Sequence, residues 1–389
     1  MQIVRCCCSV LSLVVIIATL SGCQTPPLAK IDKQSIFYDQ GFRQFDKVVI
    51  EKEQDIFYLD EDAKQFVKNA LSNIYDPVEQ VSALVETIFS HSQFNLLYDG
   101  NANTVANETF KNKAANCLSM SIMTYALAQE AGMGVKFQQI DIPEYWTRRD
   151  GYSLLNGHIN LRLVPKAEPN VYQFQVQGYQ VDFDPQPARQ HFPKRIVTKK
   201  TVLAMFYNNK GAEALVKHRY VEAYAYFRQA IKVDESFSSS LVNLGLLYRI
   251  NGYYPQAQSA YEYALSLNSN SYTAMENLAY LFSVTDRQQA ANDLLKKVER
   301  QRADNPYYFV NLGETELEKG HNELALSYFK KALSLSKRQH EIYFGLARAY
   351  FQLGEVTLTE HYLQLAKDYA KNIRDEARYQ SKLNFLTSL

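Results

Sequence analysis

The feature that most constrains the fold is a 34-residue period in the C-terminal half of the chain. Four positions of the period keep their character through five consecutive units: two small residues, then a large apolar one, then a small apolar one. They are, in that order, Gly211, Gly245, Ala279, Gly313 and Ala347; Ala223, Ala257, Ala291, Ala325 and Thr359; Phe227, Tyr261, Leu295, Phe329 and Leu363; Ala230, Ala264, Val298, Ala332 and Ala366. Such self-similarity predicts a stack of identical supersecondary units.

The pattern resembles the tetratricopeptide repeat, in which each unit is a pair of antiparallel helices. Small residues on facing helices allow close approach, and the large residue fills the space above them. The resemblance implies an all-α solenoid of five repeats over residues 204–373, which binds a protein or peptide and catalyses nothing itself. Residues 374–389 have the spacing of an amphipathic helix, which we expect to cap the last repeat.

One repeat position on the helix that usually lines the concave face of such arrays carries an amide four times. These residues are Asn209, Asn243, Asn277 and Asn311. A side-chain amide can bond both N–H and C=O groups of an extended peptide, so we expect these four to line a peptide groove. The alternative is that asparagine is simply common at this position. Neighbouring groove positions present a mixed surface of Val242, Glu276, Val310 and Phe344.

The N-terminus reads as an export signal. Arg5 precedes the apolar run Val10–Leu20, which is too short to span a bilayer but suits a secretory signal. The stretch Leu20-Ser21-Gly22-Cys23 resembles a bacterial lipobox. That resemblance implies a signal peptide over residues 1–22, lipid attachment at Cys23, and a tether and lead-in segment over 23–57. With Gln24 after the cysteine, it implies the outer membrane, facing the periplasm; an ordinary secretory signal is the alternative.

Charge and cysteine usage narrow the function classes. The chain has 42 Lys and Arg against 41 Asp and Glu, so nothing electrostatic points to a nucleic acid. Of five cysteines, three leave with the signal and Cys23 would carry lipid, so Cys117 is the one remaining thiol. A leftover thiol in an oxidising compartment should be either buried or working. No phosphate loop, zinc pattern or dinucleotide fingerprint is present, so we expect no cofactor and no metal; His91 is interpreted as structural.

Residues 58–190 are expected to form a separate α+β domain, with 191–203 as a linker to the array. Leu118–Ala131 reads as an apolar helix with Cys117 at its N-terminal edge, where the helix dipole favours a thiolate. Strand-like segments follow, with His158 and Asp182 on polar faces. The expected strands are Val135–Ile142, Gly157–Val164, Val171–Val176 and Tyr179–Phe183.

This order of Cys, His and Asp resembles the transglutaminase-like superfamily, which shares papain-type chemistry on helices packed against an antiparallel sheet. Asn116-Cys117-Leu118-Ser119 matches the nucleophile helix of that family, Gly157-His158-Ile159-Asn160 its histidine strand, and Tyr179-Gln180-Val181-Asp182 its aspartate strand. The sequence departs from the family where an aromatic residue often follows the cysteine or the histidine pair, because those places hold Leu118 and Asn160.

The resemblance implies that Cys117 attacks an amide carbonyl, that His158 is its general base and later acid, and that Asp182 orients the imidazole. Asp184, just before Pro185, is the alternative third member. The backbone N–H of Cys117 and, more weakly, the Asn116 side chain would stabilise the oxyanion. The thioester would pass to water in a peptidase or amidase, or to an amine in a transglutaminase; abundant water favours hydrolysis.

Two function classes therefore stay open. The first is a lipid-anchored periplasmic cysteine-type amide hydrolase or acyl transferase whose array holds a peptide or protein. The second is a catalytically inactive transglutaminase-like fold joined to a repeat scaffold for protein–protein interaction in the envelope.

Overall fold

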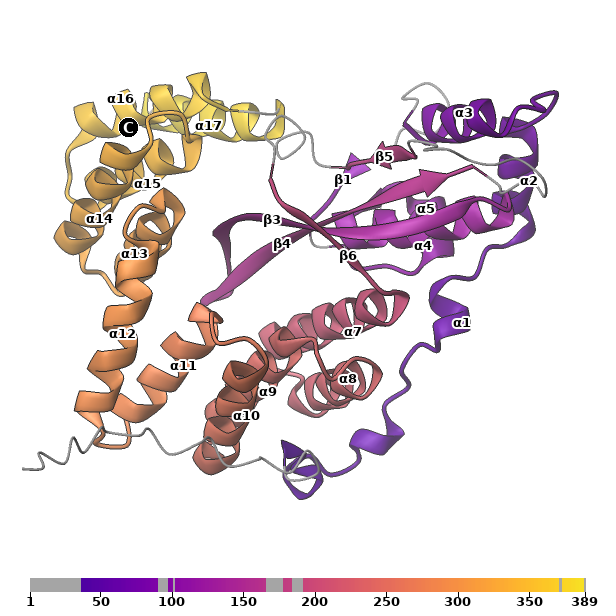
Figure 1. Cartoon of the computed structure of the whole chain (residues 1–389). Helices are drawn as coiled ribbons and strands as arrows, with labels where there is room; N and C mark the ends of the chain where they lie inside the picture. Colours follow the sequence, from indigo (N-terminus) through magenta and orange to yellow (C-terminus); the bar gives the residue numbers. More distant parts are fainter. Residues whose placement is uncertain are drawn as a thin grey trace, which may run out of the picture.

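A computed structural model of the chain describes residues 36–89, 97–100, 102–165, 178–183, 192–370 and 373–387 (Figure 1). The expected signal peptide, Cys23, His91, Asp184 and the expected strand Val171–Val176 lie outside these residues. No helix in the described part of the chain is long and apolar enough to cross a membrane.

Five helices form the helical layer of the N-terminal part. Side-chain caps start two of them: Asp60 Oδ1 accepts from the backbone N–H of Ala63, and Asp76 Oδ1 accepts from the backbone N–H groups of Val78 and Glu79. The helices are α1 (Glu53–Ile56), α2 (Glu61–Ala70), α3 (Pro77–Phe89), α4 (Ala106–Asn112) and α5 (Cys117–Glu130). Helix α5 is buried on nearly all sides, which explains why its sequence is almost continuously apolar.

Helix α5 packs against an antiparallel four-stranded sheet with the strand order β5-β4-β3-β6. The strands are β3 (Gly134–Arg149), β4 (Tyr152–Val164), β5 (Tyr179–Val181) and β6 (Lys194–Val197). A short parallel pair, β1 (Leu97–Tyr98) with β2 (Ala114–Ala115), lies just before α5. The described N-terminal part thus has the expected layers of helices on an antiparallel sheet.

Two features of this sheet differ from expectation. Strands β3 and β4 continue well beyond the expected ends at Ile142 and Gly157, so that residues 141–156 form a long hairpin that projects from the sheet. Of the expected linker 191–203, the described residues 192–203 are part of the fold, because β6 pairs with the edge of β3 and α7 begins at Lys199. The β-branched Ile196 and Val197 suit a strand, and the exposed edge of β3 supplies the backbone partners.

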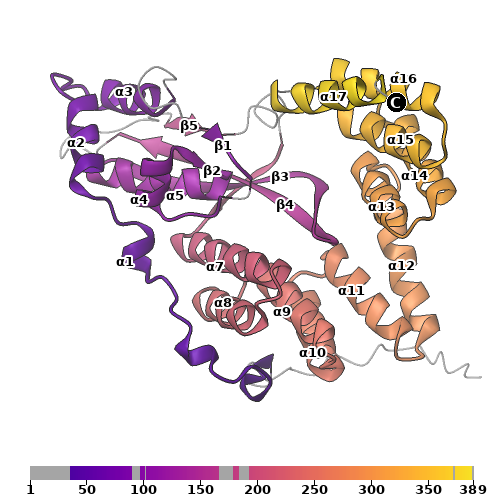
Figure 2. The same cartoon turned by 180° about the vertical axis from the view of Figure 1, so that it is seen from behind.

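The C-terminal half is an all-α solenoid of antiparallel helix pairs that curves round the β3–β4 hairpin (Figures 1 and 2). Its pairs are α7 (Lys199–Val216) with α8 (Tyr220–Val233), α9 (Ser238–Ile250) with α10 (Tyr254–Leu267), α11 (Tyr272–Ser283) with α12 (Gln288–Arg302), α13 (Pro306–Glu318) with α14 (Asn322–Leu335), and α15 (His340–Gln352) with α16 (Val356–Asp368). Helix α17 (Ile373–Leu386) covers the last pair, where Leu383 packs with Ala347 and Leu363.

The repeated small and large residues meet inside each pair. A Cβ atom placed on Gly245 would lie 2.5 Å from Cε1 of Tyr261, and one placed on Gly313 would lie 2.7 Å from Cε1 of Phe329. These distances are shorter than any ordinary carbon contact. In the third pair the small position holds Ala279 and the large position holds the smaller Leu295. The aromatic ring therefore dictates glycine, as the period predicted.

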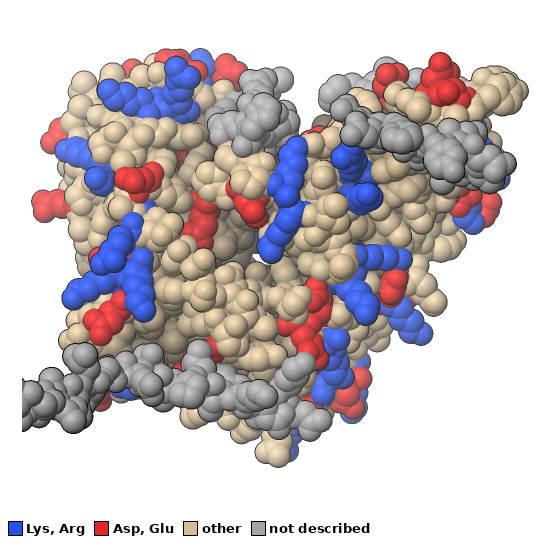
Figure 3. Space-filling view, viewed as in Figure 1, with Lys and Arg blue, Asp and Glu red and all other residues tan. Residues whose placement is uncertain are grey.

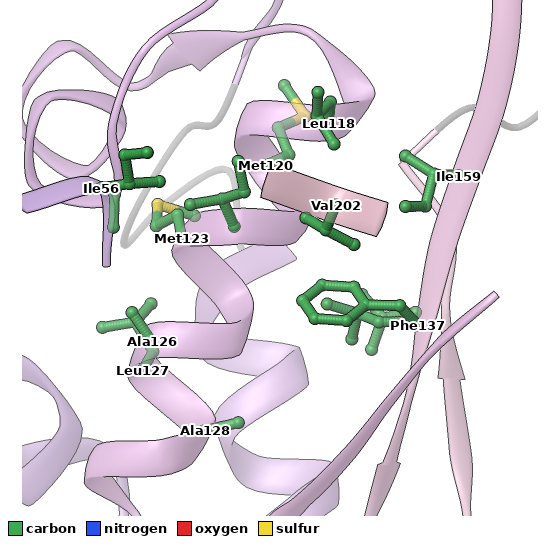
Figure 4. Packing of buried hydrophobic residues seen from close by; sticks show 14 of the residues in the cluster. Ile56, Leu118, Met120, Met123, Ala126, Leu127, Ala128, Phe137, Ile159 and Val202 are labelled. Atoms are coloured by element: carbon green, nitrogen blue, oxygen red, sulfur yellow. The ribbon is translucent and has the colours of Figure 1, made fainter. Parts of the chain in front are cut away.

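The first helix of the solenoid packs directly against the N-terminal part. Figure 4 shows Val202 of α7 among Leu118 and Met120 of α5 and Phe137 and Ile159 of the sheet, all in one buried cluster. The first repeat of a solenoid has an apolar face that no preceding repeat covers. Here the sheet and α5 cover it, so the two halves share a core.

The described part of the lead-in segment also packs on the array. It contains two short 3₁₀ turns, η2 (Asp39–Phe42) and η3 (Phe45–Lys47). Phe42 stacks on Tyr224 of α8, with ring centroids 4.5 Å apart, and Asp39 accepts hydrogen bonds from Tyr224 and Arg228. From Ile36 onward, the segment that was expected to be a tether and lead-in packs across the first two repeats; we call residues 36–47 the strap.

We predict that the effect of Gly245→Ala on stability changes sign with the residue at position 261. Alanine gains up to about 1 kcal/mol of helix propensity over glycine, but overpacking against Tyr261 costs about 1–3 kcal/mol. The substitution should lower the urea unfolding midpoint, followed by circular dichroism, in the native chain. In a Tyr261→Leu background, which copies the Ala279–Leu295 pair, it should raise the midpoint. An equal effect in both backgrounds would contradict this packing.

Candidate functional site

Cys117 is the first residue of α5 and is partly exposed. The helix begins there because Asn116 is its N-cap: Asn116 Oδ1 accepts from the backbone N–H of Ser119 at 2.9 Å. A residue in the first turn has a backbone N–H that no helical carbonyl can satisfy. The thiol therefore stands beside a backbone donor at the positive end of the helix dipole.

His158 lies on β4 and faces a carboxylate from the end of β5. Its side chain is 3% exposed, and its Nε2 lies 2.8 Å from Oδ1 of Asp182. The register that pairs Leu161 with Val181 places Asp182, the residue directly after β5, beside Asn160. The Nδ2 group of Asn160 accordingly donates to Asp182 Oδ2 at 3.1 Å. Asp182 is thus held by an amide and an imidazole from one strand.

The electrostatics of this cluster favour a charged imidazole. Burial by itself would lower the pKa of His158, because it removes water from the charged form. Hydrogen bonds to Asp182 and to Cys117, together with the negative charges of these two groups, instead raise the pKa of His158 to about 10. His158 therefore interacts with both the carboxylate of Asp182 and the thiol of Cys117.

The structure brings three of the candidate residues, Cys117, His158 and Asp182, into one cluster, while Asp184 lies outside the described residues. Asn116 uses its carbonyl oxygen as a helix cap, so only its Nδ2 group could act toward an oxyanion. The arrangement has the parts of a nucleophile, a base and an orienting carboxylate. Its catalytic use stays a prediction.

Asn160 is the residue of this site that sequence reasoning overlooked. It is fully buried and fixes Asp182. In the sequence, Asn160 stands out only as a departure from the transglutaminase-like pattern. A signal was present, because residues two apart on a strand share a face and Asn160 therefore accompanies His158 on the polar side of β4.

The four asparagines of the expected peptide groove have different roles. Asn311 Oδ1 accepts from the Ser153 hydroxyl of the β3–β4 hairpin at 2.6 Å. Asn243 donates to Asn208, and Asn277 donates to the backbone of Thr273 on its own helix. Asn209 is half-buried in α7. In this structure Asn311 is the groove asparagine that contacts a strand, and that strand belongs to the same chain.

No group of three or more His, Cys, Asp or Glu residues that could hold a metal occurs in the ranges that the structure describes. Acidic and basic side chains are interspersed over the described surface of the face seen in Figure 3.

We predict that Asp182→Asn lowers the pKa of His158, because the substitution removes the carboxylate charge that stabilises the imidazolium. In the native chain the His158 ring should titrate near pH 10, followed by the NMR shift of its Cε1 proton. A histidine with a raised pKa stabilises the fold fully below its ordinary value of about 6.5, and this contribution is lost as pH rises through about 10.

Asp293→Asn, an exposed carboxylate in α12, is the matched control and should leave the His158 titration unchanged. A His158 ring that titrates at its ordinary pH in the native chain would contradict the cluster.

Comparison with known proteins concerns the C-terminal half. The tetratricopeptide repeat family model matches residues 242–306 and 310–372. No curated protein matches the chain. The solved MamA protein is 20% identical, with a TM-score of 0.26, and the match covers 44% of this chain and 93% of that one.

Two further solved structures are similar in the same way. The thermophilic TPR protein TTC0263 of Thermus thermophilus is 20% identical, with a TM-score of 0.32, over 46% of this chain and 98% of its own. Pseudomonas aeruginosa pilF is 19% identical, with a TM-score of 0.30, over 49% of this chain and 94% of its own. The helix pairs, the 34-residue period and the family match together show that the C-terminal half of this chain is a tetratricopeptide repeat array, a type of scaffold that generally binds peptides or proteins.

Proposed function

We propose that this chain is a protein-binding scaffold whose array holds a peptide or protein for a thiol site that performs cysteine-type amide hydrolysis or acyl transfer. The observation that carries the chemical part is the position of His158. Its Nε2 lies 2.8 Å from Oδ1 of Asp182, and its interaction with Cys117, the first residue of a helix, helps to raise the pKa of His158. A thiol next to a charged imidazole and a helix N-terminus is in the environment that activates cysteine nucleophiles.

The proposed reaction uses these groups in sequence. The Cys117 thiolate attacks the carbonyl carbon of an amide, and the backbone N–H of Cys117 donates to the oxyanion. The tetrahedral intermediate collapses, the C–N bond breaks, and the imidazolium of His158 gives its proton to the leaving amine. Water, or an acceptor amine, then loses a proton to His158 as it attacks the thioester, the C–S bond breaks, and the acyl product and the Cys117 thiolate are released. Asp182, fixed by Asn160, holds the imidazole throughout.

The resemblance to the transglutaminase-like superfamily supports this proposal from the residues quoted for it. The order Cys117, His158, Asp182 falls on a helix start followed by neighbouring antiparallel strands, which is the arrangement that the resemblance implied. Hydrolysis is preferred over cross-linking, because water is the more abundant acceptor in an extracytoplasmic compartment.

A second candidate function is a scaffold without chemistry, in which the thiol site is a remnant of an enzyme fold. The match of the C-terminal half to a repeat family that binds proteins favours it, because that half alone is sufficient for a scaffold. The two candidates share the array and differ only in whether the Cys117 cluster reacts.

We predict that a peptide with a vinyl sulfone in place of an amide labels Cys117 of the folded chain at least about tenfold faster than the denatured chain. His158→Ala should lower the labelling rate roughly 10²-fold, since a positioned base contributes about that much. Mass spectrometry locates and times the adduct, and His321→Ala, an exposed array histidine, is the matched control. Equal rates for the folded and the denatured chain would favour the unreactive scaffold.

We also propose that Cys23 carries a lipid that anchors the chain to the bacterial outer membrane, facing the periplasm. The support is the stretch Leu20-Ser21-Gly22-Cys23 directly after an apolar run. Cells that express the full chain and are fed an alkyne-tagged fatty acid should label it, and Cys23→Ser should abolish the label. A native chain that stays unlabelled would contradict the anchor.

A further inference from the structure

The β3–β4 hairpin, residues 141–156, lies against the third and fourth helix pairs of the array (Figures 1 and 2). The contact is centred on Arg302, the last residue of α12, whose side chain is only 2% exposed. We call the set of Arg302, Glu276 of α11 and Tyr308 of α13, together with the hairpin residues that touch them, the Arg302 site.

Arg302 contacts carboxylates and aromatic rings, the two kinds of group that suit a guanidinium. Its Nε and Nη2 donate to the two carboxylate oxygens of Glu144, at 2.6 and 3.0 Å, while Nη1 lies 2.6 Å from Oε2 of Glu276. Its guanidinium carbon lies 4.8 Å from the ring centre of Trp146 and 5.5 Å from that of Tyr308. A two-point carboxylate contact combined with aromatic faces is specific to arginine.

The array supplies one half of this site and the hairpin the other. Glu276 and Tyr308 belong to the array, whereas Glu144 and Trp146 belong to β3. A buried guanidinium needs a carboxylate to balance its charge and acceptors for its N–H groups. The edge toward the hairpin is compensated by Glu144, so the array by itself presents a site for a carboxylate with an aromatic ring next to it.

The hairpin meets this site as an extended peptide would. Residues two apart on a strand point to the same side, so Glu144 and Trp146 face Arg302 together. The pairing of β3 with β4 is irregular between Ile140 and Tyr145, which takes this part of β3 out of the regular ladder. The backbone carbonyl of Glu144 instead accepts from the Asn305 side chain at 2.7 Å. A side chain of the array thus replaces a strand partner.

Contacts further along the hairpin involve helix α13. Arg148 forms an ion pair with Glu318 at the end of α13, and the Ser153 hydroxyl donates to Asn311. Asn311 is one of the four amides that the sequence pattern assigned to a peptide groove. The hairpin therefore occupies part of the surface on which the array was expected to bind a partner.

We propose that the Arg302 site binds an extended segment of a partner protein in which a glutamate and an aromatic residue stand two positions apart, and that the hairpin is its resident occupant. The proposal deepens the binding role of the array under the proposed function and is independent of the thiol chemistry. A partner of this kind has to displace Glu144 and Trp146 before it can bind.

The test uses a fluorescent synthetic peptide with the sequence of residues 141–149 and the full chain in four forms. Glu144→Ala with Trp146→Ala weakens the resident occupant, and this double variant should bind the peptide at least tenfold more tightly than the native chain by fluorescence anisotropy. Addition of Arg302→Gln to the double variant should weaken binding at least tenfold. Arg287→Gln, an exposed arginine near the start of α12, is the matched control and should have no effect.

Changes in the peptide give the same test without a further protein variant, in case Arg302→Gln fails to fold. A peptide with glutamine in place of its glutamate, or alanine in place of its tryptophan, should bind the double variant at least tenfold more weakly. The proposal is overturned if the double variant does not bind the native peptide, or if binding is indifferent to Arg302 and to both peptide changes. Either result would leave the labelling of Cys117 unaffected, so the two proposals fail separately.

Discussion

The buried charge of Arg302 is the interaction on which the arrangement of this chain depends. It lies in the array, yet one of its carboxylate partners, Glu144, comes from a strand of the sheet. Removal of one partner from a buried pair costs about 3–5 kcal/mol, which is a large share of the 5–15 kcal/mol by which a typical fold is stable. The hairpin is therefore strongly held against the array.

A second junction makes this attachment rigid. The first helix pair shares a buried cluster with α5 and the sheet, through residues such as Val202 and Phe206. Two junctions, one at the first pair and one at the third and fourth, fix the array relative to the sheet. Because β4 carries His158 and also forms one arm of the hairpin, one strand pair links the thiol cluster to the contact with the array.

The sequence predicted those features that depend on local patterns. The 34-residue period located the helix pairs, since Gly245 opposite Tyr261 is a local packing rule that each unit repeats. The helix caps at Asp60 and Asp76 are equally local, because capping involves residues only three apart. The order of Cys117, His158 and Asp182 on a helix start and following strands was also readable, and the structure places the three together.

Features set by contacts between distant residues could not be predicted in this way. Residues 141–156 lack the apolar alternation of a sheet strand, because their side chains contact the array and do not pack into the core of their own domain. Glu144 and Arg302 are 158 positions apart, and neither stands in a motif. The strap at Asp39 and the edge strand β6 could not be predicted for the same reason, since each needs a surface formed by another part of the chain.

The most direct test of this account is amide hydrogen exchange of the full chain compared with its Arg302→Gln variant, measured by mass spectrometry. If Arg302 holds the hairpin in the array, exchange over residues 141–156 should become at least about tenfold faster in the variant, since local opening free energy sets the rate. Exchange in α5 should not change, because its core does not contain Arg302. Unchanged exchange in the hairpin would contradict the account.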